Sequence, residues 1–144
     1  MIFLDASAAA KRYFPEAGSA RIAELLSNPE SHCSLALLPC ELASALNRRL
    51  REGDISRAIY RAAREQMKKD AIAISAVRVD DELIQASLRL LDLHPLKTLD
   101  SLYLAAALNL QTVSITPVLF VSADRQLLRA ARAEDLQVLD PEAA

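Results

Sequence analysis

Short apolar runs alternate along the chain with longer segments in which apolar residues recur every three or four positions. The first pattern predicts buried strands and the second predicts amphipathic helices. Strands are expected at residues 1–5, 31–37, 71–77, 118–122 and 136–140. Helices are expected at residues 6–14, 16–28, 39–53, 54–69, 80–93, 99–108 and 123–134. Because strands and helices follow one another repeatedly, we predict an α/β fold with a short central parallel sheet covered by helices on both faces.

The length and composition of the chain narrow the class of protein. Its 144 residues are 52% hydrophobic and 25% charged, which suits a single domain, residues 1–144, with one packed core. The net charge of −2 disfavours binding of long duplexes through a broad basic face, and an aromatic content of 4% disfavours a base-stacking platform. No apolar run reaches the roughly 18 residues of a membrane span, and the N-terminus does not read as a signal peptide. We therefore expect a cytoplasmic protein that does not contact a membrane.

Four carboxylates take similar positions relative to these elements. Asp5 closes the first strand, and Asp124 follows the fourth strand at the start of a helix. Glu41 lies in the first turn of the helix after the second strand, and Asp100 lies in the first turn of the most apolar helix. In an open parallel sheet, ligands bind beyond the carboxyl ends of the strands. We therefore expect the four acids to gather at this edge of the sheet.

Each acid also has a purely structural interpretation. Asp5 and Asp124 suit the N-cap positions of the helices that follow them, and Glu41 complements the dipole of its helix from the first turn. Thr98 or Asp100 suits the cap of the apolar helix. The joint placement favours a functional site, because Glu41 and Asp100 lie in apolar surroundings where an ionised group needs partners.

Carboxylates that gather without a counter-charge repel one another and raise one another's pKa values, and a bound cation relieves this repulsion. Mg²⁺ and Mn²⁺ prefer oxygen ligands and keep several waters, so an open cluster of acids without His or Cys suits them better than zinc. The two cysteines, Cys33 and Cys40, lack the paired spacing of a zinc site and are expected to be small buried residues. The sequence therefore predicts an oxygen-lined site for Mg²⁺ or Mn²⁺.

The segments around the four acids resemble the motifs of one nuclease family. They are D-A-S from Asp5, P-C-E-L-A-S-A-L around Glu41, L-K-T-L-D-S-L-Y-L-A-A-A-L around Asp100 and F-V-S-A-D-R-Q-L-L around Asp124. The chain, to about residue 139, resembles PIN-domain ribonucleases, and most closely the VapC-type toxins of bacterial toxin–antitoxin pairs. The segment around Asp100 is the most specific of the four.

This resemblance implies a metal-dependent endoribonuclease that hydrolyses RNA phosphodiesters with water activated by carboxylate-bound Mg²⁺ or Mn²⁺. The same four acids would be the catalytic residues and metal ligands, with Asp5 and Asp100 as the central pair. Ser7 and Ser122 would support the acids through hydrogen bonds. The resemblance also implies a toxin role, an RNA substrate, a cognate antitoxin protein that blocks the site, and a homodimer held largely by helices.

The chain departs from the family pattern at two places. Tyr103 stands where many relatives have His, and Leu37-Leu38 replaces a small polar residue that often precedes the glutamate. Neither change removes an acid, so both bear on substrate preference more than on catalysis.

RNA must approach an acidic pocket, so flanking cations should offset the negative field. Arg48, Arg49 and Arg51 follow the glutamate on its helix, although most such residues are ordinary surface charges. Lys97 and Arg125 are the better candidates among the cations that lie closest in sequence to the acids. Those cations are Lys11, Arg12, Lys97 and Arg125.

An apolar stripe on the second predicted helix suggests how partners bind. Its residues, Ile22, Leu25 and Leu26, are expected to stay partly exposed on a small domain. A second copy of the chain or the antitoxin would bury this surface.

Two other interpretations stay open. A phosphoacceptor role for Asp5, as in receiver or haloacid-dehalogenase-like folds, calls for a second acid two residues later or an acidic pair just before, and D-A-S offers neither. A non-catalytic interaction module would instead present the apolar stripes of residues 21–26 and 55–67 to a partner. Binding of Mn²⁺ at millimolar concentration separates the nuclease from the interaction module.

Overall fold

A computed structural model describes residues 1–143 and contains a parallel sheet of five strands. The strands are β1 (Ile2–Leu4), β2 (His32–Leu35), β3 (Ile74–Val77), β4 (Leu119–Val121) and β5 (Gln137–Leu139). Their order across the sheet is β3-β2-β1-β4-β5, and every neighbouring pair is parallel. The predicted α/β class is confirmed, and β1 and β4 are neighbours at the centre of the sheet.

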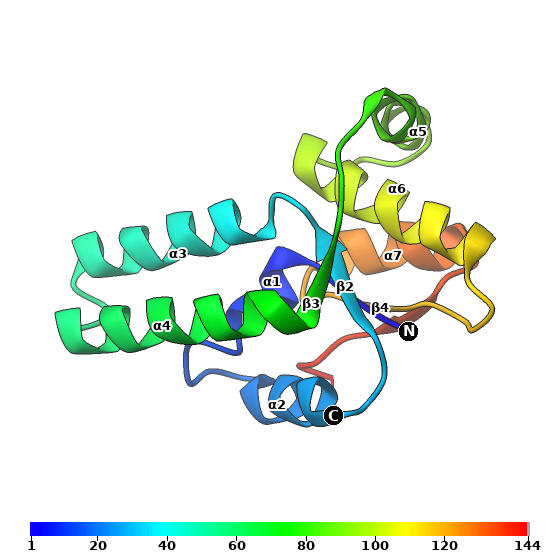
Figure 1. Cartoon of the computed structure of the whole chain (residues 1–144). Coiled ribbons are helices and arrows are strands. Elements are labelled where there is room, and N and C mark those ends of the chain that lie inside the picture. The colour runs from blue at the N-terminus through cyan, green and yellow to red at the C-terminus, as the bar shows by residue number, and fades with distance from the viewer. Residues whose placement is uncertain (144) are drawn as a thin grey trace.

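Seven helices within residues 1–143 surround this sheet (Figure 1). They are α1 (Ala6–Ala10), α2 (Ser19–Ser27), α3 (Leu38–Glu52), α4 (Arg57–Ala73), α5 (Asp81–Leu93), α6 (Thr98–Val113) and α7 (Arg125–Ala133). In Figure 1, α3 and α4 lie side by side and extend to one side of the sheet, whereas α5 packs on α6 at the other side. No helix in the described residues is both long enough and apolar enough to cross a bilayer.

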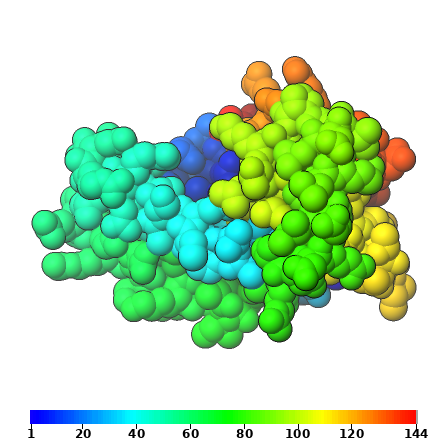
Figure 2. Space-filling model, turned by 90° about the horizontal axis from the view of Figure 1, so that it is seen from above, coloured from blue at the N-terminus to red at the C-terminus, as the bar shows by residue number. Residues whose placement is uncertain are grey.

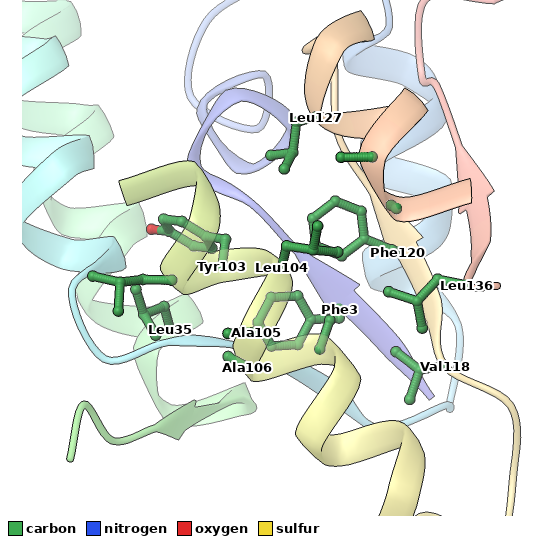
Figure 3. Close-up of a cluster of buried hydrophobic side chains, with 14 of the residues drawn as sticks. Phe3, Leu35, Tyr103, Leu104, Ala105, Ala106, Val118, Phe120, Leu127 and Leu136 are labelled. Carbon is green, nitrogen blue, oxygen red and sulfur yellow. The ribbon is translucent and has the colours of Figure 1, made fainter. Parts of the chain in front are cut away.

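The side chains of the central strand divide between two cores. Phe3 faces a cluster built with α6 and α7, in which its ring stacks on that of Phe120 with 5.8 Å between centroids (Figure 3). Ile2 and Leu4 face the opposite cluster, which includes residues of α1, α2 and α3. This division follows from the two-residue repeat of a strand. Helices therefore cover both faces of the sheet, as the sequence predicts.

Residues with known cap preferences set several helix ends. Ser56 and Asp80 accept backbone hydrogen bonds through their side chains and cap α4 and α5. Gly53 ends α3 with a φ of 79°, in the left-handed region that glycine adopts readily. Helix α6 continues to Val113, beyond its predicted end, because no glycine or proline interrupts it before Pro117.

The first helical segment is shorter than predicted. Helix α1 ends at Ala10, and residues 11–18 form turns and coil, because the residue before Pro15 is disfavoured in a helix. Gly18 then precedes α2 with a φ of 85°, and a Cβ at this position would lie 2.9 Å from the carbonyl oxygen of Pro141. The loop before α2 and the C-terminal segment are therefore in close contact.

The two cysteines differ in environment. Cys33 is buried in β2, as expected, but Cys40 is exposed. Cys40 lies in the first turn of α3, where Leu38 and Leu42 pack into the core. A residue two positions from both of these leucines lies on the opposite side of the helix. The prediction that both cysteines are buried is therefore wrong for Cys40.

Candidate active site

Asp5 lies where β1 ends, and it is the most deeply buried of the four acids, with 4% of its surface exposed. Its Oδ1 accepts the backbone N–H of Ala8 at 2.9 Å, so Asp5 is the N-cap of α1. The Ser7 hydroxyl lies 2.9 Å from both carboxylate oxygens of Asp5. The Ser122 hydroxyl, just after β4, donates to Oδ2 at 3.0 Å. Asp5 is therefore held rigidly from two neighbouring strand ends.

Burial raises the pKa of Asp5 from 3.8 to about 6. The hydrogen bonds from Ala8, Ser7 and Ser122 oppose this rise, and the negative charge of Asp100 adds to it. Burial disfavours the ionised form more than the three donors favour it. A cation close to Asp5 would reverse this balance.

The two serine hydroxyls also connect the end of β1 to the end of β4. Ser7 Oγ accepts the backbone N–H of Ala123 at 2.9 Å, and Ser122 Oγ accepts that of Asp124 at 3.0 Å. Asp124 caps α7, because its Oδ1 accepts two backbone N–H groups of the first turn. The hydrogen bonds expected from the serines are present, and their part in holding a metal ion stays a prediction.

Asp100 lies in the first turn of α6 but is not its N-cap. The N-cap residue is Lys97, and no side chain caps this helix. The interpretation of Thr98 or Asp100 as the cap therefore finds no support. Burial raises the pKa of Asp100 and the charge of Asp124 raises it further, whereas Lys97 lowers it through its charge and its backbone N–H. The chain thus keeps an acid at the start of α6 without using it as the cap.

Glu41 approaches the same region from the first turn of α3. Burial raises the pKa of Glu41, the nearby Tyr103 hydroxyl lowers it, and the charge of Asp100 raises it. Its carboxylate oxygen Oε2 is buried and has no hydrogen-bond partner in residues 1–143. A buried oxygen without a hydrogen-bond donor lowers the stability of the folded protein. Oε2 of Glu41 is therefore available to accept a hydrogen bond or to bind a cation.

Asp100 is the electrostatic centre of the four acids. Its negative charge acts on Asp5 and on Glu41, and the charge of Asp124 acts on Asp100. In the described part of the chain, no group of three or more His, Cys, Asp or Glu side chains is close enough to hold a metal ion in this geometry. The acids therefore share one region and repel one another, at separations larger than those of ligands on one ion.

A hollow of ≈ 440 Å³ opens beside Glu41, which is the one member of the four acids among its lining residues. Its lining includes Ser7 from α1, Glu41 from α3 and Leu99 from the first turn of α6. Figure 2 looks down on this region: the blue N-terminal residues lie at the bottom of a depression between the cyan surface of α3 and the yellow-green surface of α6. A substrate can thus approach Glu41 from one open side.

The chemistry of the donors fits a hard divalent cation. All four candidate ligands are carboxylates, and Glu41 offers a buried oxygen that has no other partner. A cation would stabilise the ionised forms that burial and mutual repulsion now disfavour. The residues therefore suit Mg²⁺ or Mn²⁺, and binding requires the side chains to approach one another more closely than they do here.

The family of proteins described as PIN domain matches residues 2–133, a span that contains all four acids. The chain belongs to the PIN domain family. No curated protein sequence matches it. PIN domains are generally nucleases and generally use divalent metal ions. The predicted family is confirmed, whereas the narrower likeness to VapC-type toxins stays a prediction.

Two of the four cations expected to bind RNA are engaged in ion pairs with carboxylates other than the four acids. Lys11 is 5% exposed and pairs with Glu142 at 2.5 Å and with Glu16 at 3.5 Å. Arg12 pairs with Asp70 on α4 at 3.4 Å. Neither cation lines the hollow. Ion pairing makes Lys11 and Arg12 less available to a substrate, and their part in RNA binding stays a prediction.

Other cations of the PIN domain are better placed. Lys97 and Arg125 are exposed at the N-terminal ends of α6 and α7, next to Asp100 and Asp124 respectively. Arg48 is exposed on α3 and lines the hollow together with Glu41. Arg49 also lines the hollow but pairs with Glu16 at 2.9 Å. The spacing of seven residues between Glu41 and Arg48, two turns of helix, is a sequence signal that places both on one face of α3.

A second hollow of similar size lies on the other side of α3 and has a different chemistry. Its lining comes from β2, β3, α3 and α4 and is mostly apolar, with Leu42, Met67 and Ile74 among its residues. None of the four acids lines it. The candidate active site of the PIN domain is therefore the hollow that contains Ser7 and Glu41.

Proposed function

We propose that this PIN domain is a Mg²⁺- or Mn²⁺-dependent endoribonuclease that hydrolyses RNA phosphodiester bonds in the hollow between α3 and α6. The observation that carries the proposal is the grouping of four carboxylates around Asp100 at the carboxyl edge of a parallel sheet. An acidic group of this kind repels RNA unless a cation is bound, and oxygen ligands suit these two ions.

The residues of the chain take distinct parts in such a reaction. A divalent cation, when bound, lowers the pKa of an attacking water and neutralises charge on the phosphate and the leaving oxygen. Asp5 and Asp100 are the proposed central ligands, and Glu41 and Asp124 are ligands or acceptors that orient water. The two serine hydroxyls fix Asp5, and the capping hydrogen bonds of α7 fix Asp124. The protein thereby contributes mainly positioning.

Cleavage of total cellular RNA tests this proposal. The purified protein with Mg²⁺ or Mn²⁺ is expected to shorten the RNA, and EDTA is expected to stop the reaction. Cleavage that persists in EDTA, or that survives the substitution Asp100→Asn, contradicts the mechanism. A protein that binds no Mn²⁺ at millimolar concentration is instead an interaction module with a PIN fold.

Lys97, Arg125 and Arg48 are the proposed contacts for RNA phosphates. Replacing any one of them by Ala is expected to raise KM by roughly threefold to fivefold and to leave kcat unchanged, because one exposed charge pair contributes up to about 1 kcal/mol. Steady-state cleavage of a short RNA measures both constants. Arg61→Ala on the exposed side of α4 is the control and should leave KM unchanged. An equal rise in KM for Arg61→Ala would show that only overall charge matters.

We also propose a homodimer, although not through the predicted stripe. Ile22 is fully buried, contrary to expectation, whereas Leu25 and Leu26 are partly exposed as predicted but pack against the same core. Helix α5 offers apolar surface instead: Ile84 and Leu88, one turn apart, are 42% and 49% exposed. Light scattering at tens of micromolar should give twice the mass of one chain, and Leu88→Lys should give a monomer. A monomer for the unchanged protein contradicts the proposal.

The finer proposal is that the chain is the toxin of a toxin–antitoxin pair and that a small antitoxin covers the hollow. It rests on the likeness of the Asp100 segment to VapC-type toxins. Expression in a host that lacks the antitoxin is expected to arrest growth, and expression of Asp100→Asn is not. Normal growth of cells that accumulate the unchanged protein contradicts the toxin role.

A further inference from the structure

Tyr103 combines a buried ring with a hydroxyl that has no partner. The residue lies in α6, three positions after Asp100, and is 2% exposed. Its ring packs edge-on against Phe3, with 6.5 Å between centroids and an interplanar angle of 78°. The hydroxyl is buried and makes no hydrogen bond in residues 1–143. Figure 3 shows it pointing out of the apolar cluster toward the side on which α3 lies.

The other unpartnered polar atom of this kind in residues 1–143 is Oε2 of Glu41. The two side chains are neighbours: the Tyr103 hydroxyl lowers the pKa of Glu41, and Glu41 raises that of Tyr103. One atom is a proton donor and the other is an acceptor. A small rotation of the side chains that joins the hydroxyl to the carboxylate oxygen would stabilise the folded protein, because each buried group otherwise lacks a hydrogen-bond partner.

We infer that Tyr103 is a positioning residue whose hydroxyl donates to Glu41 and fixes its carboxylate beside Asp100. The ring is suited to this task because Phe3 and the surrounding core restrict its rotation. The catalytic consequence rests on the proposed nuclease function, whereas the contact itself does not. The tyrosine at this position, where many relatives have His, thereby has a specific role in this chain.

A competing partner for the hydroxyl is Ser34 at the end of β2. Ser34 lies near Tyr103 and lowers its pKa. However, the Ser34 hydroxyl already donates to the backbone carbonyl oxygen of Leu4 at 2.6 Å. Ser34 Oγ can therefore only accept from Tyr103, and that arrangement would leave the oxygen of Glu41 without a partner.

A double-mutant cycle in metal-free protein tests the contact. Tyr103→Phe removes only the hydroxyl and is expected to lower the Tm by roughly 5 °C, because a hydrogen bond to a carboxylate is lost. In the background of Glu41→Ala, the same change is expected to leave the Tm unchanged or to raise it. Equal losses of Tm in both backgrounds would assign the hydroxyl to Ser34 and overturn the inference. Tyr60→Phe, whose hydroxyl lies 3.4 Å from Asn47 Oδ1, is the control and should act equally in both backgrounds.

Mn²⁺ binding and RNA cleavage then test the positioning role. Tyr103→Phe is expected to weaken Mn²⁺ binding in calorimetry about fivefold and to lower kcat roughly tenfold at unchanged KM, with no further effect in Glu41→Ala. If Tyr103→Phe lowers the Tm but changes neither Mn²⁺ affinity nor kcat, the contact is merely structural and the inference is wrong. If the unchanged protein neither binds Mn²⁺ nor cleaves RNA, the proposed function fails, and the stability cycle still decides whether Tyr103 holds Glu41.

Discussion

Replacing Asp100 by Asn is expected to abolish RNA cleavage while the metal-free protein melts at the same temperature or higher. Asp100 is not the N-cap of α6, so the substitution costs no capping hydrogen bond. The substitution removes a negative charge that burial and the charge of Asp124 both disfavour. The same charge of Asp100 also disfavours the ionised forms of Asp5 and Glu41. A proposed central ligand is thus a source of repulsion when no cation is bound.

The effect of metal on the same variant has the opposite sign. At a Mn²⁺ concentration about 100 times the Kd, the unchanged protein should gain roughly 2.7 kcal/mol of stability by mass action. The Asp100→Asn variant should lose most of this gain. Thermal melts in EDTA and in Mn²⁺ measure both quantities, with Asp92→Asn, an exposed change on α5, as the control that keeps the full response. Equal metal-induced shifts for Asp100→Asn and the unchanged protein would show that Asp100 is not a ligand.

The fold could be predicted from the sequence because its elements depend on local patterns. The apolar runs that form β1 and β4 are short and bounded by polar residues, and caps such as Ser56 and Gly53 act within one turn of helix. The segment after α1 was harder to predict, because good helix formers continue past Ala10. Pro15 disfavours a helix at the residue before it, and the contact of Gly18 with Pro141, which joins residues far apart in the sequence, then fixes the loop before α2.

The acids of the site were also predictable, because strand ends and first helical turns place them. Parallel strands bring their carboxyl ends to one edge, so Asp5 and Asp124, which follow the neighbouring strands β1 and β4, lie at the same edge of the sheet. The cations behave differently. Lys11 is bound by Glu142, 131 positions away, and no local pattern indicates such a pair. The orientation of a long charged side chain depends on the tertiary contacts available to it.

Helix capping and metal binding are not alternatives at this site. Asp5 and Asp124 both cap a helix, and both also belong to the group of acids. Each cap uses Oδ1, and in Asp124 no hydrogen bond of the described residues engages Oδ2. A cap fixes the direction of a carboxylate and in Asp124 leaves Oδ2 for a ligand, so the structural role supports the proposed chemical one there, whereas Oδ2 of Asp5 already accepts hydrogen bonds from Ser7 and Ser122.

Raising the pH from about 4 to about 6 is expected to destabilise the metal-free protein through Asp5. Folded Asp5 has a pKa near 6, against 3.8 in the unfolded chain, so the folded state holds the extra proton between these values. Stability from this group is complete below pH 4 and is lost as the pH rises through 6. At 1.36 kcal/mol per pKa unit, the whole loss, from about pH 3 to about pH 7, amounts to about 3 kcal/mol. Urea unfolding of the chelator-treated protein at several pH values measures it.

The variant Asp5→Asn isolates this contribution. The amide still caps α1, and the hydroxyls of Ser7 and Ser122 can rotate to accept its N–H groups, but it does not titrate. The stability of the unchanged protein relative to Asp5→Asn should therefore fall by about 3 kcal/mol between pH 3 and 7. The stability of the unchanged protein relative to the control Asp92→Asn should change little over the same range. With saturating Mn²⁺ the fall should vanish, because a cation favours the ionised carboxylate. A flat difference without metal would mean that the three hydrogen-bond donors outweigh burial and keep Asp5 ionised, and that the acidic site is poised for a cation even at low pH.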